Sequence, residues 1–219
     1  MTYSIAAKCA RTGMFGCAVT TSSIAVGSRC AYARAGVGSV LTQHRTDPRL
    51  GPRGLDLLAE GLDAATVVDR LTRDVPGIGW RQLAIVDAQG RTAAYHGARI
   101  TSVHSHHEGA QCIAAGNILT NADVPRAMVA AFEARPAAHL AERLVLALEA
   151  GYAAGGEPKQ VKSAALLVVE LESFPLVDLR VDYDPQPLVQ LRWLWENYEP
   201  AAKLYVERAV NPDGAPGAA

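Results

Sequence analysis

The first 21 residues limit the possible folds more than any other segment of the chain. Residues 3–9 and 15–21 are two short runs of mostly small and apolar side chains, and a turn at residues 11–13 connects them. Two such runs joined by a short glycine-containing turn predict a β-hairpin. The hairpin places Thr2 at the tip of its first strand.

Thr2 is a candidate nucleophile. A methionine before a small residue is usually removed by aminopeptidase, so we expect Thr2 to become the N-terminal residue. An α-amino group titrates at about 7.7–8.0 and is partly a free base near neutrality. It can take the proton of the threonine hydroxyl, directly or through a water. Ser4 lies on the same strand face and is a second candidate, although a strand hydroxyl bonded to backbone is the simpler interpretation.

Hairpins and helix pairs alternate along the rest of the chain. Strands are expected within 31–42 and over 82–86, 92–96, 99–105, 110–115, 163–170 and 176–182. Helices are expected over 52–61, 64–72, 123–133, 139–149 and 185–198, with Asp63 capping the second. The order lacks a regular strand–helix–strand alternation, which favours an α+β protein with mostly antiparallel sheets. Two such sheets covered by two helical layers form a four-layer αββα sandwich.

Length and composition favour one globular domain. The chain has 219 residues, of which 49% are hydrophobic, and a net charge of −1. We expect the domain to span 1–210 and a disordered tail to span 211–219. No basic excess indicates a nucleic-acid partner, and no apolar run predicts a signal peptide or a membrane span. We therefore expect a cytoplasmic protein. Its cysteines are predicted to be buried, reduced thiols: Cys9, Cys17, Cys30 and Cys112.

Three further polar residues are candidates for the chemistry. Asn117 follows a glycine at a strand end, where its amide can donate to a developing oxyanion or can simply occupy a turn. Arg34 lies in a run of small residues, where it can bind a substrate carboxylate or form an interface ion pair. Ser22, just after the hairpin, is an alternative hydroxyl for the same pocket.

Two other segments carry polar side chains of interest. Gln43 and His44 end a predicted strand and are expected to line the substrate pocket. Residues 104–108 read His-Ser-His-His-Glu, in which His104 and His106 would share a strand face. Because no third ligand is arranged with them, an exposed loop is the better interpretation of this segment. The sequence predicts neither a metal site nor a cofactor.

Eight segments taken together resemble one bacterial family, the domain of unknown function 1028 (DUF1028) family. These segments are residues 2–6, 33–43, 51–58, 82–87, 116–119, 149–151, 163–169 and 178–182. The resemblance covers roughly residues 1–199 and implies the fold of an N-terminal nucleophile (Ntn) hydrolase. Gene neighbourhoods in the family suggest breakdown of amides or other nitrogen compounds. The chain departs from the family before the strand at 163–170, where it reads Lys-Gln-Val-Lys-Ser.

The main hypothesis is an amidohydrolase that cleaves a C–N bond of a small catabolic metabolite. In it Thr2 attacks the carbonyl, Asn117 and backbone amides hold the oxyanion, and Arg34 orients the substrate. A deaminase of enamines or imines that uses the same pocket without a covalent intermediate is the alternative. A ligand-binding protein on an inactive hydrolase fold is the third possibility. A homodimer or higher homo-oligomer is expected from the aromatic residues of the last predicted helix: Trp193, Trp195 and Tyr198.

Overall fold

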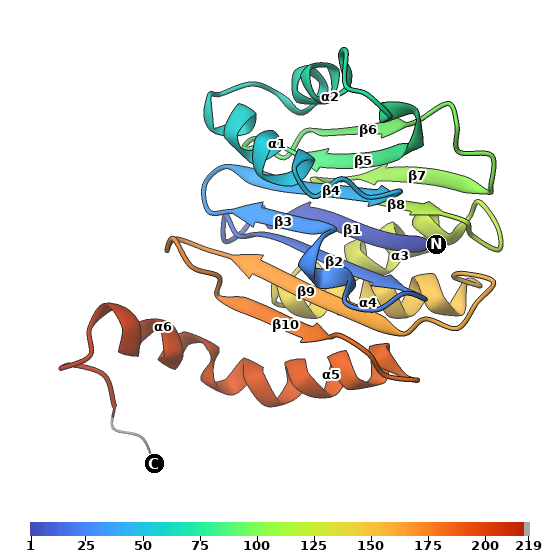
Figure 1. Cartoon of the computed structure of the whole chain (residues 1–219). Helices are drawn as coiled ribbons and strands as arrows, with labels where there is room; N and C mark the ends of the chain where they lie inside the picture. The colour runs from blue at the N-terminus through green and yellow to red at the C-terminus, as the bar shows by residue number, and fades with distance from the viewer. Residues whose placement is uncertain (217–219) are drawn as a thin grey trace.

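Two antiparallel sheets form the middle of the molecule, whose computed structural model describes residues 1–216 (Figure 1). The six-stranded sheet has the order β10-β9-β2-β1-β8-β7, and the four-stranded sheet has the order β3-β4-β5-β6. The strands are β1 (Thr2–Lys8), β2 (Phe15–Thr21), β3 (Ala31–Arg34), β4 (Gly38–His44), β5 (Arg81–Val86), β6 (Thr92–His96), β7 (His104–Gly109), β8 (Cys112–Asn117), β9 (Ser163–Val169) and β10 (Val177–Val181).

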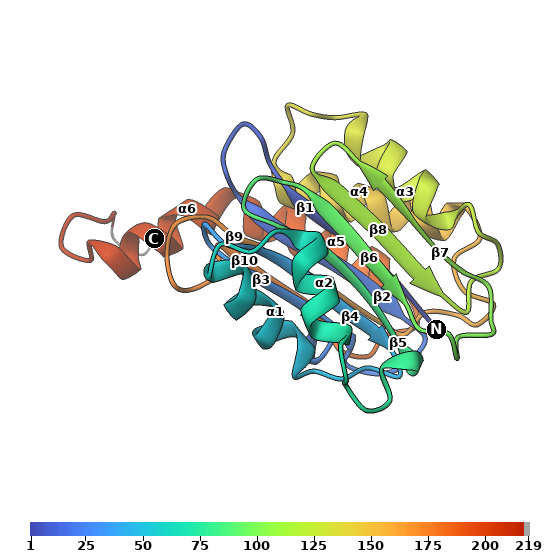
Figure 2. The ribbon, with the colours of Figure 1, turned by 90° about the horizontal axis from the view of Figure 1, so that it is seen from above.

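Helices cover the outer face of each sheet (Figure 2). The helices α1 and α2 pack on the four-stranded sheet, whereas α3, α4 and α5 pack on the six-stranded sheet. The helices are α1 (Leu50–Ala59), α2 (Ala64–Thr72), α3 (Val124–Glu133), α4 (Leu140–Ala153), α5 (Pro187–Tyr198) and α6 (Ala202–Val210). The result is an α+β sandwich of four layers, as the sequence predicts, with α6 extending past the edge of the sheets (Figure 1).

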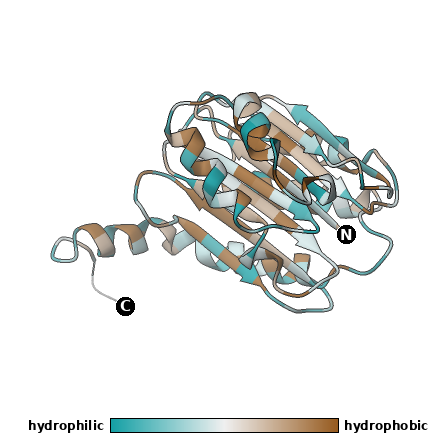
Figure 3. Ribbon diagram, turned by 45° about the horizontal axis from the view of Figure 1, so that its top comes forward, coloured by the Kyte–Doolittle hydropathy of each residue, from teal (hydrophilic) through white to brown (hydrophobic). Residues whose placement is uncertain are grey.

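Alternation of side chains along β1 explains this layering. Tyr3 and Ile5 point outward into the cluster under α3 and α4, whereas Ala6 belongs to the cluster between the two sheets. Successive residues of a strand face opposite sides, so Thr2 and Ser4 share the inter-sheet face with Ala6. The strands are largely hydrophobic and the loops largely hydrophilic (Figure 3). Burial of two opposite faces thus determines which side chains of β1 meet the facing sheet.

Strand register fixes the position of Thr2. The strand β1 lies between β2 and β8, and Thr2 is directly opposite Asn117 at the end of β8. The facing strand β4 runs close by, because Ser4 Oγ donates to Gln43 Oε1 at 2.7 Å. Thr2 therefore lies at one end of the sandwich, where the ends of β1, β4 and β8 converge.

Most predicted elements are confirmed, within a few residues at their ends. The helix at 64–72 and its Asp63 cap are as expected, since Asp63 Oδ1 accepts from the Thr66 N–H at 2.8 Å. The predictions for 99–105 and for an exposed loop at the histidines are wrong, because residues 104–109 form the edge strand β7. Its side chains are half-buried or exposed and show no apolar alternation, so the sequence carries little signal of this strand.

The C-terminal part differs most from expectation. No helix is predicted after residue 198, yet Pro200 lies in a short 3₁₀ turn that leads into the helix α6. Of the aromatic residues expected at an oligomer interface, Trp195 is buried in the core of this chain, whereas Trp193 is 57% exposed. The predicted tail at 211–219 begins with turns at 211–215, and residues 217–219 lie outside the described part of the chain.

Two features of the described chain bear on its environment. All four cysteines are buried, as predicted, and are free thiols. None of the helices within residues 1–216 has the length and apolar character that crossing a lipid bilayer requires.

Candidate functional site

Thr2 and Thr21 form a pair of hydroxyls beneath Met1. The two residues lie side by side on β1 and β2, with their Oγ1 atoms 3.5 Å apart. Both hydroxyls donate to the carbonyl oxygen of Met1. Thr2 is only 6% exposed. The structure thus holds a carbonyl oxygen between two hydroxyl donors at the tip of β1.

A cavity of about 300 Å³ opens beside this pair, and Met1 forms part of its wall. Its other lining residues come from the end of β4, the turn before β5, the β6–β7 loop and the residue after β8: His44, Arg45, Trp80, Arg99, Thr101, Ser102 and Ile118. His44 and Ile118 have positive φ angles, 72° and 51°. Such angles are uncommon for residues other than glycine and are a genuine outlier for a β-branched residue. Backbone strain of this kind gathers at functional sites.

His44 supplies a neutral base to the cavity. Its Nδ1 lies 2.7 Å from the carbonyl oxygen of Trp80. A carbonyl oxygen only accepts, so Nδ1 carries the proton and, in the neutral ring, Nε2 keeps its lone pair. Burial is the main factor that lowers the pKa of His44, and the positive N-terminus and Arg45 add to this effect. The predicted pocket role of His44 therefore fits its position.

A ladder of buried amides connects the two sheets behind Thr2. Ser4 donates to Gln43 Oε1, and Gln43 Nε2 donates to Gln82 Oε1 at 2.7 Å. The same Gln82 oxygen accepts from Asn117 Nδ2 at 2.9 Å, and Gln82 Nε2 donates to the Gly116 carbonyl at 2.8 Å. Ser4 and Gln43 are fully or almost fully buried and bonded to each other, so both serve this ladder and neither lines the cavity.

Asn117 lies beside Thr2, as predicted, but its amide nitrogen does not face the Thr2 hydroxyl as a free donor. That nitrogen is bonded to Gln82, whereas Asn117 Oδ1 is buried without a hydrogen-bond partner among the described residues. A buried amide oxygen without a partner is costly and suits a site that receives a donor. The N–H groups of a substrate or of the N-terminal amine are donors of this kind.

Ser22 and Glu157 lie next to the N-terminal residue Met1. The Ser22 N–H donates to Glu157 Oε2 at 3.1 Å, and Ser22 Oγ lies 3.7 Å from Met1 Sδ. Burial raises the pKa of the Glu157 carboxyl to about 7. Burial also lowers the pKa of the Met1 α-amino group, an effect that the charge of Glu157 opposes. A buried carboxyl and an amine thus titrate next to each other at this end of the sandwich.

Arg34 does not join this site, which corrects the expectation that it converges on Thr2. It pairs with Gly38 at the start of β4, whereas His44 is at the end of the same strand. Its guanidinium forms an exposed ion pair with Asp56 at 2.8 Å. Arg34 therefore forms an exposed ion pair within the chain, between β3 and α1.

The histidines of β7 gather around His96 of the neighbouring sheet. The ring centroids of His104 and His106 each lie 5.0 Å from that of His96, and His96 Nε2 is 2.8 Å from His106 Nδ1. Gln82 Nε2 lies 3.0 Å from His96 Nδ1 and so connects the histidines to the amide ladder. Among residues 1–216, no three His, Cys, Asp or Glu side chains are grouped to hold a metal ion.

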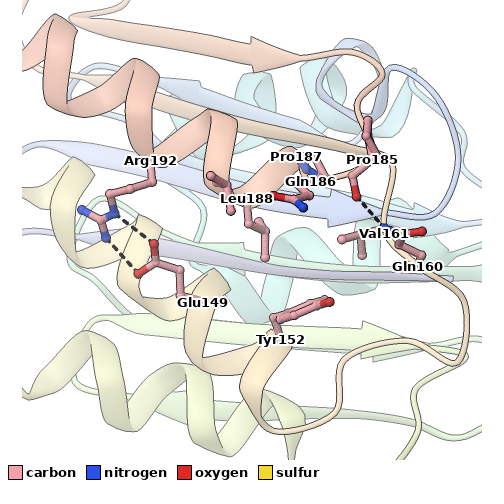
Figure 4. A pocket seen from close by; sticks show the side chains of 10 residues that line it. Glu149, Tyr152, Gln160, Val161, Pro185, Gln186, Pro187, Leu188 and Arg192 are labelled. Atoms are coloured by element: carbon pink, nitrogen blue, oxygen red, sulfur yellow. Dashed lines mark hydrogen bonds and ion pairs between the residues drawn. The ribbon is translucent and has the colours of Figure 1, made fainter.

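A second cavity, of about 400 Å³, lies between α4 and α5 (Figure 4). Its walls include Tyr152 and Leu188, and the Arg192–Glu149 ion pair borders it. Because both helices pack on the outer face of the six-stranded sheet, this sheet separates the cavity from the inter-sheet face of Thr2. Its lining holds no serine, threonine or cysteine, the residues that serve as nucleophiles in amide hydrolysis, and no histidine.

Sequence reasoning missed the residues that complete the site. Thr21, Trp80, Arg45, Arg99 and Glu157 belong to five separate segments, and only the fold brings them together. No local signal marks Glu157, because it follows two glycines and precedes a proline, a pattern that predicts a loop and not a buried carboxyl.

Comparisons with known proteins find a matching family and similar solved structures. The model of the family of unknown function DUF1028 matches residues 2–191. The crystal structure of the DUF1028 protein SPO2555 from Silicibacter pomeroyi is 32% identical, covers 90% of this chain and 85% of its own, and superposes with a TM-score of 0.84. Anbu (ancestral beta-subunit) from Yersinia bercovieri aligns over 99% of both chains with 11% identity and a TM-score of 0.42. No curated protein matches the chain.

Proposed function

The chain belongs to the family of unknown function DUF1028, and we propose that it is an Ntn amidohydrolase with Thr2 as its nucleophile. One observation carries the proposal. Thr2 is buried at the tip of the central strand β1, on the inter-sheet face, with its hydroxyl beside Thr21 and under a carbonyl oxygen at the wall of a cavity. The four-layer αββα arrangement is the one expected of Ntn hydrolases.

Removal of Met1 opens the cavity onto Thr2 in this mechanism. The Thr2 hydroxyl attacks the carbonyl carbon of a small amide, and its proton passes to the α-amino group of Thr2. The C–N bond then breaks as the leaving nitrogen takes that proton. Water hydrolyses the resulting ester and restores the Thr2 hydroxyl.

Thr21 supports the charge that develops on the oxygen. Its hydroxyl already donates to a carbonyl oxygen next to the Thr2 hydroxyl, that of Met1. A substrate carbonyl in the place that Met1 vacates would receive the same bond. We therefore assign the oxyanion donor to Thr21, together with backbone amides, and give Asn117 Oδ1 the task of accepting an N–H.

A deaminase of enamines or imines is the second candidate, and His44 is the observation that favours it. Its neutral ring lines the cavity with an unprotonated Nε2, so proton transfer there needs no free N-terminus. This reaction would form no bond to Thr2. The two proposals therefore differ in whether the hydroxyl of Thr2 is acylated.

Acylation by a β-lactone probe tests the proposal. Intact mass should show that the purified protein lacks Met1, and peptide mapping should place the probe on Thr2. Thr2→Ala should keep its thermal unfolding but lose the label, while Thr12→Ala, in the exposed β1–β2 turn, should label normally. Retention of Met1 in most of the labelled protein, or full labelling of Thr2→Ala, would contradict the proposal. Turnover that persists in unlabelled Thr2→Ala would support the deaminase.

A further inference from the structure

We propose that Arg45 and Arg99 form a carboxylate-binding subsite next to Thr2, so that the substrates are small amides that also carry a carboxylate. This inference deepens the proposed function, and it depends on that function only in treating the bound molecules as substrates. Binding of an anion at Arg45 and Arg99 can be measured directly, without any catalysed reaction.

Both guanidinium groups meet at one indole ring in the cavity wall. Arg45 Cζ lies 3.7 Å from the ring centroid of Trp80, and Arg99 Cζ lies 5.6 Å from it. All three side chains line the cavity that Met1 borders. A guanidinium at stacking distance uses its flat face on the ring and leaves its N–H groups, which lie in its plane, for a partner. Those in-plane groups match the two oxygens of a carboxylate.

Neither guanidinium has an acidic partner in the described part of the chain. The ion pairs formed within residues 1–216 involve other arginines or His106; Arg49 with Asp47 and Arg91 with Asp87 are two examples, both at less than 3 Å. Two positive charges that share one ring repel each other, and a bound anion would offset that repulsion. The arrangement therefore fits a ligand of negative charge better than a neutral one.

Backbone contacts hold the subsite in place. The Arg45 N–H donates to the Trp80 carbonyl at 3.3 Å, and the Arg99 N–H donates to the Gly79 carbonyl at 2.8 Å. At Gly97 the β6–β7 loop approaches the turn before β5 so closely that a Cβ there would lie 2.2 Å from the Gly79 oxygen. His44 stacks on Trp80 with 6° between the ring planes and 6.3 Å between centroids. Both arginines are thus carried by main chain that is bonded to the turn of Trp80.

The size of the cavity limits the ligand. A volume of about 300 Å³ lies at the lower end of the range for small-molecule sites. An amide carbonyl beside Thr2 and a carboxylate at the two arginines are the two ends of such a ligand. Amides of short dicarboxylic acids meet both requirements. Simple uncharged amides leave the arginines without a partner.

Calorimetric titration with succinate and with its neutral diamide, succinamide, tests the subsite. We expect succinate to bind wild-type protein and Thr2→Ala alike, and succinamide to bind at least about tenfold more weakly. Arg45→Gln and Arg99→Gln should each weaken succinate binding by about tenfold or more, because each removes a charge-assisted contact. Arg53→Gln, an exposed arginine of α1 outside the cavity, is the matched control and should bind as wild type.

The outcomes separate this inference from the proposed function. Succinate binding that survives in both arginine variants, equal binding of succinamide, or no binding of succinate by wild-type protein would overturn the subsite. In each of these cases a β-lactone adduct on Thr2 would still support the hydrolase. Conversely, arginine-dependent succinate binding without an adduct would keep the subsite and remove the nucleophile. Unchanged thermal unfolding of both variants confirms that a loss of binding is local.

Discussion

The side-chain nitrogen of Asn117 donates to Oε1 of Gln82 at 2.9 Å, across the interface of the two sheets. Asn117 is therefore oriented by the facing sheet, with its own Oδ1 left free of partners in the described structure. Gln82 also serves Gln43, the Gly116 carbonyl and His96, so one buried amide sets the positions of several groups behind Thr2. Its role is to position these groups, and it does not touch the cavity.

Gln82→Leu should destabilise the protein by about 3 kcal/mol, because it leaves several buried polar groups without partners. The midpoint of urea unfolding measures this loss. The exposed turn residue Gln89 provides the control, and Gln89→Leu should change stability by less than about 0.5 kcal/mol. If the two variants unfold alike, the amide ladder does not stabilise the sheet interface.

Thr21→Val should slow β-lactone labelling of Thr2 by about a hundredfold, because it removes a donor to the reacting oxygen. Thr21→Ser, which restores the hydroxyl, should recover most of the rate. Thr20→Val is the matched control: the Thr20 hydroxyl is also buried but donates to the Ser163 carbonyl at 2.8 Å, on the other face of the sheet. A slow Thr20→Val or a fast Thr21→Val would contradict the assignment of the oxyanion donor.

Arg34→Ala should leave succinate binding unchanged. Its guanidinium pairs with Asp56 at the far end of β4, and both side chains are largely exposed, at 43% and 65%. Such a pair contributes at most about 1 kcal/mol to stability. Calorimetry measures succinate binding by Arg34→Ala, and thermal unfolding measures its stability. A tenfold loss of succinate affinity would show that Arg34 does contribute to the site.

The sequence predicted the layers of the fold well because burial has a short period along the chain. The two apolar runs of the first hairpin and the spacing of apolar residues in the helices are local patterns, and they indicate these elements directly. The sequence does not predict the edge strand β7, because one of its sides faces solvent. In addition, the turn between β7 and β8 contains Gln111, a non-glycine residue in a left-handed conformation with φ 61°. An edge strand does not need the apolar pattern that identifies a central one.

The candidate site was predictable only in part. Thr2 and Asn117 lie side by side, as predicted, because the antiparallel pairing of β1 with the distant strand β8 brings the ends of these two strands together. The sequence suggests a substrate-binding arginine within a strand, at Arg34, whereas the arginines that line the cavity, Arg45 and Arg99, follow strands and enter it from loops. The whole fold determines which loops come together, so the spacing of residues along the sequence cannot predict it.

Acid should destabilise the protein through His96. Burial, together with His106 and His104, lowers the pKa of His96 to about 4 from an ordinary value of 6.5. Between these pH values the unfolded chain takes up a proton that the folded chain refuses, so stability falls as pH falls. Because His96 is only partly buried, we expect a loss of about 1–2 kcal/mol.

Urea unfolding of wild type and His96→Gln from pH 7 to pH 4 measures this contribution. The comparison is needed because Glu157 acts in the opposite direction: its raised pKa of about 7 makes stability fall as pH rises from 4.5. The difference between the two proteins cancels the Glu157 effect, and it should shrink steadily towards pH 4. If the difference in unfolding free energy does not depend on pH, the pKa of His96 in the folded protein is not lowered by its burial and its neighbouring histidines.

Glu157 should set the acid limb of the nucleophile's pH profile. In the chain that keeps Met1, the charge of Glu157 raises the pKa of the Met1 α-amino group, against the effect of burial. We expect the same effect on the Thr2 amine that removal of Met1 creates. The amine must be unprotonated to accept the proton of Thr2, so labelling declines as pH falls through its pKa. Glu157→Gln removes the carboxylate, lowers the pKa of the amine and should move the acid limb of the β-lactone labelling rate to lower pH by about half a unit or more.

Glu60→Gln, exposed at the end of α1, should leave the profile unchanged. A limb that stays in place or moves to higher pH in Glu157→Gln would mean that the base for Thr2 is not its own amine.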